Sequence, residues 1–512
     1  MKSVADRNTI LNEYSELLSD ESKFTLGTPQ KIFFPESPDD ISEILREASI
    51  SATPVILCGA RTGITGGAVP VENCILISFS KMNKILECVW EDGTPVLTCQ
   101  PGVTLTEIRS FLQDPSKWPY EVKGDLPVAE EFFYPPDPTE LTAQLGGTAA
   151  TNASGARSFF YGATRDHISS LQLVLPTGHI EHLERSKNKF STVKLEKSGI
   201  EFDPPHYSMP DVKNATGYYS SSKPDPVDLF IGSEGTLAVF SKIGIRLSRR
   251  PRIIAGLCFL PSRNASFNFA DFLRTQKNVA AIEYFDSSTL ELLKNSKFSH
   301  LSSLPDFPEN MSCALFWELI EDEGISFENL FEQWEKQLNT HGSSFDLSWS
   351  GFEPNELAKL KAIRHAVPES INLLMTQNKQ SCPAVRKIST DSALPSLYFR
   401  PWFNRCISAL EKENLRYAVF GHIGDYHLHI NILPGNETEL SKSINLYNSF
   451  MYDAVSKGGT LSAEHGIGKL KSDLLEKFYP KNVLNEMRRI KNVFDSKWLL
   501  NRGTLLEKKA HQ

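Results

Sequence analysis

The stretch that decides the fold runs from Pro135 to Ile180 and reads PPDPTELTAQLGGTAATNASGARSFFYGATRDHISSLQLVLPTGHI. Its centre, Gly146 to Gly155, contains only Gly, Ala, Ser, Thr and Asn. We expect neither a packed helix nor a packed strand at this centre. Small side chains and glycines instead let the backbone lie against a flat ligand.

A second glycine-rich stretch lies upstream. Residues 54–59, PVILCG, predict a buried strand that runs into the loop GARTGITGGAVP, residues 59–70. The glycines of this loop allow backbone N–H groups to approach a diphosphate. Their spacing matches neither a Walker A loop nor a Rossmann fingerprint, so an ordinary glycine-rich turn stays an alternative.

The sequence around these stretches predicts regular elements. Ser37 and Pro38 begin a helix that buries one apolar face, and a capping box of Thr104 and Glu107 begins another. Strands are expected at residues 74–79, 85–90 and 95–102. After residue 250, apolar runs alternate with helical runs at 267–274, 327–337 and 397–411. This alternation predicts an α+β sheet that helices cover on one side.

Histidines cluster in FGHIGDYHLHINILP, residues 420–434, and in LSAEHGIGK, residues 461–469. On a strand, His429 shares one face with His427 and Asn431 because side chains alternate. His422, His429 and Glu464 could bind a catalytic divalent ion such as zinc, with His465 left as a base. Core histidines or a solvated sheet face remain the alternative, because the spacing matches no short zinc motif.

Composition narrows the classes of function. The 512 residues, 40% hydrophobic and 23% charged, indicate a soluble globular protein of two or three domains. The net charge of −8 argues against a nucleic-acid partner. Eight cysteines without Cys-x-x-Cys spacing fit reduced thiols in a cytosol and offer no iron–sulfur site. We expect neither a targeting signal at the N-terminus nor a transmembrane segment.

An ordered series of motifs carries a resemblance to a known family. Residues 54–70, 135–178, 213–218 and 231–237 resemble the FAD domain of the vanillyl-alcohol oxidase and p-cresol methylhydroxylase flavoproteins. Residues 420–434 and 464–468 resemble the branch that holds D-lactate dehydrogenase, the glycolate oxidase D subunit and D-2-hydroxyglutarate dehydrogenase.

This resemblance implies an α+β fold in three parts. A two-part FAD-binding domain of the p-cresol methylhydroxylase type is expected at residues 28–250, and an α+β, ferredoxin-like cap over the substrate at 251–430. A C-terminal helical segment at 431–512 is expected to complete the active site.

The resemblance also implies which residues bind FAD. Because Arg61 and Thr62 occupy the loop in which relatives often carry a histidine, we expect non-covalent binding. The implied residues are Gly59, Ala60, Arg61, Thr62, Gly63, Ile64, Thr65, Gly66, Pro136, Gly146, Gly147, Thr148, Asn152, Ser154, Gly155, Gly162, Ile231, Glu234, Gly235, Leu237 and Asn501.

The implied activity is oxidation of a small D-2-hydroxy acid, of the D-lactate, glycolate or D-2-hydroxyglutarate class, by hydride transfer to flavin N5. The implied catalytic residues are His465 as base, Arg364 on the substrate carboxylate and Asn431 near the substrate. His422, His429 and Glu464 would hold the metal, with zinc the first candidate. A flavin oxidase, an alkyl-dihydroxyacetone-phosphate synthase type transferase and a non-catalytic flavoprotein subunit of a glycolate oxidase complex remain alternatives.

The sequence departs from the family pattern at two places that bear on the substrate. Tyr426 and His427 replace a Gly-Asn pair, and Ser389 stands where a lysine helps to hold a second carboxylate. We expect these changes to influence the choice of substrate.

Electrons are expected to pass to an external acceptor, a quinone, a cytochrome or an electron-transfer flavoprotein. The expected location is the cytoplasm, with attachment to the inner membrane surface left open. A homodimer is also left open.

Overall fold

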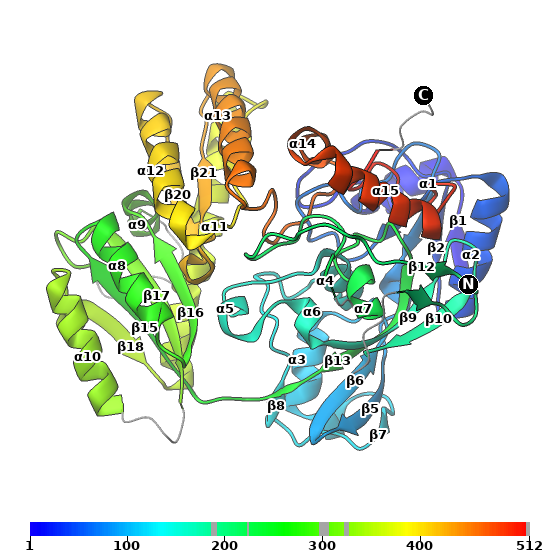
Figure 1. Cartoon of the computed structure of the whole chain (residues 1–512), viewed down its shortest axis with the longest axis horizontal. Coiled ribbons are helices and arrows are strands. Elements are labelled where there is room, and N and C mark those ends of the chain that lie inside the picture. Colours follow the sequence, from blue (N-terminus) through cyan, green and yellow to red (C-terminus); the bar gives the residue numbers. More distant parts are fainter. Residues whose placement is uncertain (186–191, 223–224, 296–306, 322–326, 508–512) are drawn as a thin grey trace.

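A computed structural model of the chain describes residues 1–185, 192–222, 225–295, 307–321 and 327–507. Figure 1 shows two lobes, the first coloured blue to green with red helices and the second green to orange, joined by an extended green segment. The last helices return to the first lobe, where the N-terminus also lies. The fold therefore places N- and C-terminal segments together and a central segment apart.

The first lobe contains two main sheets. One has the order β1-β2-β4-β3, with strands at Lys2–Val4, Lys31–Phe34, Ile75–Ser78 and Val55–Cys58. The other has the order β10-β9-β13-β6-β5-β7, with strands at Ile180–Glu184, Ile168–Val174, Val239–Arg246, Thr94–Cys99, Ile85–Glu91 and Lys123–Gly124.

Smaller elements complete this lobe. Two strand pairs join β8 (Phe132–Phe133) to β14 (Ser248–Arg249) and β11 (Val193–Lys194) to β12 (Glu201–Phe202). Short helices are α1 (Arg7–Glu13), α5 (Ser158–Tyr161), α6 (Thr164–His167) and α7 (Pro226–Phe230).

The expected helices and strands of the first lobe are confirmed. Helix α2 spans Pro38–Ser51, and the Ser37 side chain forms a capping box with Asp40. Helix α3 spans Leu105–Gln113 behind the capping box of Thr104 and Glu107. Strands β3 to β6 fall within or one residue beyond the predicted runs. Local sequence signals were sufficient here because each element has a clear cap or apolar run.

The prediction that no helix forms within residues 146–155 is wrong. Helix α4 occupies Leu145–Thr151 and buries Leu145, Thr148 and Ala149. A Cβ atom on Gly146 would lie 2.6 Å from the Pro101 side chain, so the small residues permit close packing on a neighbouring loop. Weak intrinsic helix propensity is outweighed by this tertiary packing.

The second lobe is built on a seven-stranded sheet of order β18-β15-β17-β16-β20-β21-β19. Every paired strand is antiparallel to its neighbour. The strands span Ser348–Gly351, Ile253–Leu260, Cys313–Ile320, Val279–Phe285, Tyr417–Gly421, His429–Ile432 and Ile388–Ser389.

Helices cover both faces of this sheet, so the prediction of one covered side is wrong. Helices α8 (Arg263–Arg274), α10 (Phe327–Thr340) and α12 (Ser396–Lys412) pack in one apolar cluster, and α9 (Ser287–Lys294) and α11 (Pro354–Ser381) in the other. In β15, Leu257 faces one cluster and Cys258 the other. The expected helices all lie on the first face, and α9 and α11 were not among them.

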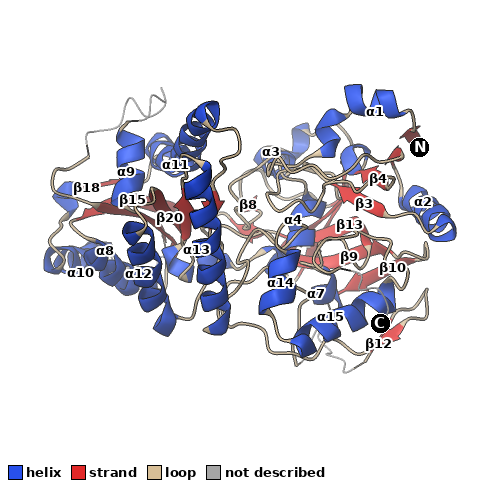
Figure 2. Cartoon of the chain, turned by 90° about the horizontal axis from the view of Figure 1, so that it is seen from above, coloured by secondary structure: helices blue, strands red, loops and turns tan. Residues whose placement is uncertain are grey.

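The chain leaves this lobe through α13 (Glu437–Ser456), and α14 (Ser472–Phe478) and α15 (Lys481–Phe494) pack on the first lobe (Figure 2). Leu500 then forms a bridge with Val55 at the edge of β3. Within the described residues, none of the helices has the length and apolar character needed to span a membrane.

Candidate active site

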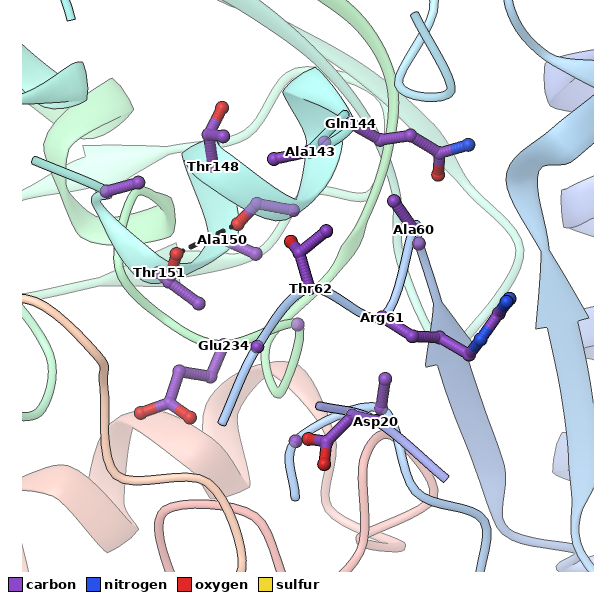
Figure 3. Close-up of a pocket in the computed structure, with 18 of the residues that line it drawn as sticks. Asp20, Ala60, Arg61, Thr62, Ala143, Gln144, Thr148, Ala150, Thr151 and Glu234 are labelled. Carbon is purple, nitrogen blue, oxygen red and sulfur yellow. Dashed lines mark hydrogen bonds between the residues drawn. The ribbon is translucent and has the colours of Figure 1, made fainter. Parts of the chain in front are cut away.

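A cavity of about 330 Å³ lies in the first lobe beneath the glycine-rich loop that follows β3. This volume falls within the range of ligand pockets. In Figure 3, the Thr62 side chain projects from the loop toward helix α4, and Glu234 and Asp20 lie in the lower part of the view. The two glycine-rich stretches, distant in sequence, thus form two walls of one cavity.

Most residues predicted to bind FAD line this cavity. They are Gly59, Ala60, Arg61, Thr62, Gly63, Ile64, Thr65, Gly146, Gly147, Thr148, Ser154, Glu234, Gly235 and Asn501. The remaining predicted residues lie outside the lining: Gly66, Pro136, Asn152, Gly155, Gly162, Ile231 and Leu237. Ile231 and Leu237 are fully buried in the apolar core, and Gly155 packs on the backbone of Asp137.

The cavity wall has features of a cofactor cradle. A Cβ atom on Gly63 or Gly147 would meet no atom within 4 Å, so these glycines leave space where a side chain would enter the cavity. The buried Oε1 of Gln144, another lining residue, has no hydrogen-bond partner among the described residues. An unpaired buried acceptor is unfavourable and fits a donor supplied by a ligand.

Two residues that the sequence did not single out hold the glycine-rich loop. The Asp20 carboxylate accepts a hydrogen bond of 2.8 Å from the Gly66 N–H. Lys469 Nζ donates to the carbonyls of Gly66 and Gly67, at 3.2 and 3.0 Å. Asp20 belongs to no recognisable local motif, and Lys469 ends the stretch LSAEHGIGK without an assigned role, since each contacts the loop only through the tertiary fold.

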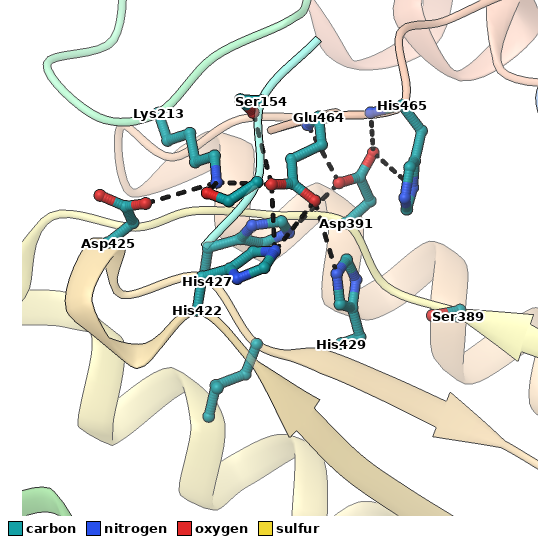
Figure 4. A network of polar contacts seen from close by, with 12 residues as sticks. Ser154, Lys213, Ser389, Asp391, His422, Asp425, His427, His429, Glu464 and His465 are labelled. Atoms are coloured by element: carbon teal, nitrogen blue, oxygen red, sulfur yellow. Dashed lines mark hydrogen bonds and ion pairs between the residues drawn. The ribbon is translucent and has the colours of Figure 1, made fainter. Parts of the chain in front are cut away.

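A buried polar cluster adjoins the cavity (Figure 4), and it contains the predicted metal ligands. His422 Nε2 lies 3.1 Å from Glu464 Oε1, and His429 Nε2 lies 3.7 Å from Glu464 Oε2. One ligand atom from each of His422, His427, His429 and Glu464 lies within 4.8 Å of the others. The structure thus brings the predicted trio together and adds His427.

The Nδ1 atoms of the two predicted histidine ligands already contact hydrogen-bond acceptors. His422 Nδ1 lies 2.5 Å from Glu283 Oε1, and His429 Nδ1 lies 3.2 Å from the carbonyl of Thr390. Acceptors of this kind fix the ring orientation of metal-binding histidines and leave Nε2 for the ion. The donor set and its outer partners therefore fit a divalent transition metal.

Glu464 and His465 reach the same site because their loop bends around Asp391. The Asp391 carboxylate accepts hydrogen bonds from the backbone N–H groups of both residues, at 3.2 and 3.1 Å. It also lies 3.2 Å from His465 Nδ1, and the His465 ring stacks on His429. His465 and Glu464 both line the cavity. An extended loop would have separated these neighbours.

Charge fixes the protonation of the cluster. Burial raises the pKa of Glu464, but His422 and Lys213 outweigh it and hold that pKa well below its usual value. Burial lowers the pKa of His422, yet Glu283 and Glu464 raise it overall to about 9. Burial lowers the pKa of His429, and it lowers the pKa of His427 to about 3. In the metal-free protein, His422 is therefore protonated between the ionised carboxylates of Glu283 and Glu464.

Lys213 is a further member of the cluster to which the sequence assigned no role. Its Nζ lies 2.5 Å from Glu464 Oε1 and 3.3 Å from Asp425 Oδ2. The Ser154 hydroxyl, 3.3 Å away, also donates to Glu464 Oε1. These contacts orient the Glu464 carboxylate. Only the position of Lys213 in a family motif, KNATGY, signalled its importance.

Arg364 and Asn431 lie beside the cluster. Arg364 Nε is 3.4 Å from Glu283 Oε2, and Nη1 is 3.5 Å from Asp137 Oδ2. The buried Nη2 has no hydrogen-bond partner among the described residues. Asn431, on β21, donates to the carbonyls of Ala418 and His429.

Of the two departures at residues 426 and 427, only His427 reaches the cluster. The Tyr426 hydroxyl donates to Asp271, and its ring packs under Arg274, so this side chain turns toward α8. Ser389 ends β19, and Figure 4 places it at the margin of the network.

Comparison with known families matches both lobes. Residues 29–122 and 126–184 match the family described as "FAD binding domain", and residues 251–505 match "FAD linked oxidases, C-terminal domain". The chain belongs to the FAD-linked oxidases. In this FAD-linked oxidase, the cavity lies in the lobe that matches the FAD-binding family.

Curated relatives cover nearly the whole chain. A D-2-hydroxyglutarate dehydrogenase of Stutzerimonas stutzeri is 28% identical and covers 97% of this chain and 94% of its own length. Glycolate oxidase subunit GlcD of Bacillus subtilis and a D-lactate dehydrogenase of Anaerostipes hadrus are each 27% identical, with 94% of this chain and 90% of the relative covered.

A solved structure of alkyldihydroxyacetonephosphate synthase shares the fold. It has a TM-score of 0.63 at 16% identity and covers 93% of this chain and 76% of that protein. The FAD-binding fold and the α+β second lobe of this FAD-linked oxidase therefore agree with the predicted fold class.

Proposed function

We propose that this FAD-linked oxidase oxidises a D-2-hydroxy acid of the D-lactate, glycolate or D-2-hydroxyglutarate class to the 2-oxo acid. The observation that carries the proposal is the buried histidine and carboxylate cluster, which opens onto the cofactor cavity at Glu464 and His465. The activities for which the three relatives are named support the same substrate class.

In this proposal, His422, His429 and Glu464 hold a divalent metal, with zinc as the first candidate. Such an ion, when bound, is a Lewis acid that lowers the pKa of a substrate hydroxyl. Glu283 and Thr390 fix the two histidine rings, and Lys213 fixes the Glu464 carboxylate.

The chain moves one proton and leaves two electrons to the cofactor. His465 takes the hydroxyl proton, and Asp391 at its Nδ1 keeps the ring oriented. Bound FAD would supply the acceptor for the hydrogen of the substrate Cα and its two bonding electrons. The products are a 2-oxo acid and a reduced cofactor, so charge and electrons balance.

Arg364 is proposed to hold the substrate carboxylate with its unpaired nitrogen, because guanidinium groups bind carboxylates in a fixed geometry. Asn431 is proposed to contact the substrate from β21. The predicted FAD-binding residues that lie outside the cavity lining are retained only as supports of its walls.

The wider assignments are also proposals. Residues 28–250 bind FAD without a covalent bond, residues 251–430 form the cap, and residues 431–512 complete the site. An external quinone, cytochrome or electron-transfer flavoprotein takes the electrons, and the protein works in the cytoplasm or at the inner membrane surface. A homodimer is compatible with these assignments.

The test is anaerobic reduction of the flavin. Protein loaded with FAD and zinc is mixed with D-lactate, glycolate, D-2-hydroxyglutarate and the L-isomers of the two chiral acids. Bleaching of the flavin absorbance by a D-acid or glycolate, and not by the L-isomers, is expected. Absence of bleaching with all of these acids would exclude the proposed activity.

A further inference from the structure

His427 is the member of the cluster that the predicted trio did not include. It is fully buried, and its ring centroid lies 4.6 Å from that of His429 and 5.5 Å from that of His422. Its ligand atom lies within 4.8 Å of those of His422, His429 and Glu464. A buried imidazole with three potential metal ligands around it is placed as a ligand would be.

One nitrogen of His427 is unsatisfied. Nδ1 makes no hydrogen bond with any residue in the part of the chain that the structure describes. Nε2 lies 3.2 Å from Asp391 Oδ1. A buried unpaired nitrogen is unfavourable, so the retention of Nδ1 in this position needs a compensating partner.

The surroundings of His427 repeat those of the other two histidines. His422 has Glu283 behind one nitrogen, and His429 has the Thr390 carbonyl. His427 has Asp391 in the equivalent place, with Nδ1 left over. Metal-binding histidines regularly carry an acceptor behind the ring, and the second nitrogen binds the ion.

We propose that His427 is a fourth protein ligand, so that this chain holds its ion with three imidazoles and one carboxylate. The inference rests on the proposed metal-assisted function and concerns Zn²⁺ or another borderline divalent ion. Four protein ligands complete a tetrahedral shell, so a substrate oxygen has to enter as a fifth ligand. The extra imidazole therefore strengthens retention of the ion and restricts access to it.

The experiment measures metal binding rather than turnover. Purified protein and the variants His427→Ala, His427→Asn, His422→Ala and His182→Ala are titrated with Zn²⁺ against a chromophoric chelator at one pH. His182 is an exposed histidine on β10 and is the matched control for loss of one imidazole. The absorption spectrum of the Co²⁺-loaded protein reports the coordination shell, and bound FAD reports that each variant is folded.

Both His427 variants and His422→Ala should weaken Zn²⁺ binding at least roughly 10- to 100-fold, because this is the loss when only a residue that hydrogen-bonds to a metal ligand is replaced. The His427 variants should also alter the Co²⁺ spectrum, whereas His182→Ala should match the unmodified protein. If His427→Ala fails to retain FAD, the result for His427→Asn decides the question.

Two outcomes separate this inference from the proposed function. Loss of Zn²⁺ binding in His422→Ala alone, with both His427 variants unchanged in affinity and Co²⁺ spectrum, would overturn the fourth ligand and keep the metal site. Absence of Zn²⁺ binding in the unmodified protein would overturn both the metal-assisted function and the inference.

Discussion

The affinity of the site for zinc should depend on pH through a single proton on His422. In the metal-free protein, burial lowers the pKa of His422, but Glu283 and Glu464 raise it overall to about 9. Its Nε2 must lose a proton before it can bind an ion. Below pH about 9, each decrease of one pH unit therefore weakens zinc binding tenfold, which is about 1.4 kcal/mol of binding free energy.

A plot of the logarithm of zinc affinity against pH should have a slope of one, because the other ligands carry no proton near neutral pH. The pKa of Glu464 lies well below its usual value, and burial lowers the pKa values of His427 and His429. Between pH about 7 and a pH well above 9 the expected gain is about 100-fold, or about 2.7 kcal/mol. Affinity should level off above pH about 9.

The assay is competition with a chelator of known proton affinity at several pH values. Glu283→Gln is the informative variant, because it removes the carboxylate that raises the His422 pKa most. Its affinity curve should level off at a lower pH, toward the ordinary histidine value of about 6.5. A zinc affinity that does not change between pH about 6.5 and 8.5 in the unmodified protein would refute the role of His422. A slope of two in the plot of log affinity against pH would refute the assigned protonation of the neighbouring ligands.

Three further predictions concern the proposed base His465, the proposed carboxylate ligand Arg364 and the glycines at the cofactor cavity. His465→Ala should slow flavin reduction by about 10²- to 10⁴-fold in stopped-flow mixing while FAD stays bound, and unchanged reduction would remove it as the base. Arg364→Lys keeps the charge but loses the planar fork, so KM for the acid should rise about tenfold in steady-state assays; an unchanged KM would argue against a carboxylate contact. Gly147→Leu places a side chain in the cavity and should yield protein without FAD, whose melting temperature matches that of the unmodified protein freed of FAD, since its Cβ meets no atom. Gly155→Ala is the contrast, because its Cβ would lie 1.9 Å from the Asp137 carbonyl and should destabilise the fold; equal melting temperatures for the two variants would contradict this reading.

Elements with local signals could be predicted from the sequence, and elements set by tertiary packing could not. Helix α2 has its cap, its proline and its apolar face within a few residues. Helix α4 has no such signal and forms because Gly146 can approach Pro101. Helix α11 has a proline at position 368 in its interior, which usually signals the end of a helix, although Leu360, Ile363, Val367, Ile371 and Met375 recur at helical spacing and are buried. The second covered face of the sheet was therefore missed.

The same distinction holds for the site. His422 and His429 belong to one short motif, and the sequence places them together. Glu283 and Asp391 are single acidic residues on distant segments, and only the sheet order and the loop around residues 461–468 bring them behind the histidines. Orientation of the ligands is therefore a property of the fold, whereas their identity is a property of the motif.

The cluster also lies where the two lobes meet, and this position has a mechanical consequence. Ion pairs cross between the lobes around it: Arg157 with Glu318, Lys213 with Asp425, and Asp137 with Arg364. Buried pairs of this kind add little net stability, but they fix one arrangement because a displaced partner leaves a charge unpaired.

The metal ligands are divided in the same way. His422 and His429 belong to the second lobe, and Glu464 lies on the segment that returns to the first, next to Ser462, whose carbonyl accepts a hydrogen bond from Ala215. An ion that binds all of them stabilises only the docked arrangement, by an amount that grows with its concentration relative to Kd. Removal of the ion should thus loosen the contact between the lobes before it unfolds either one, and the chemistry and the docking of the lobes depend on the same few side chains.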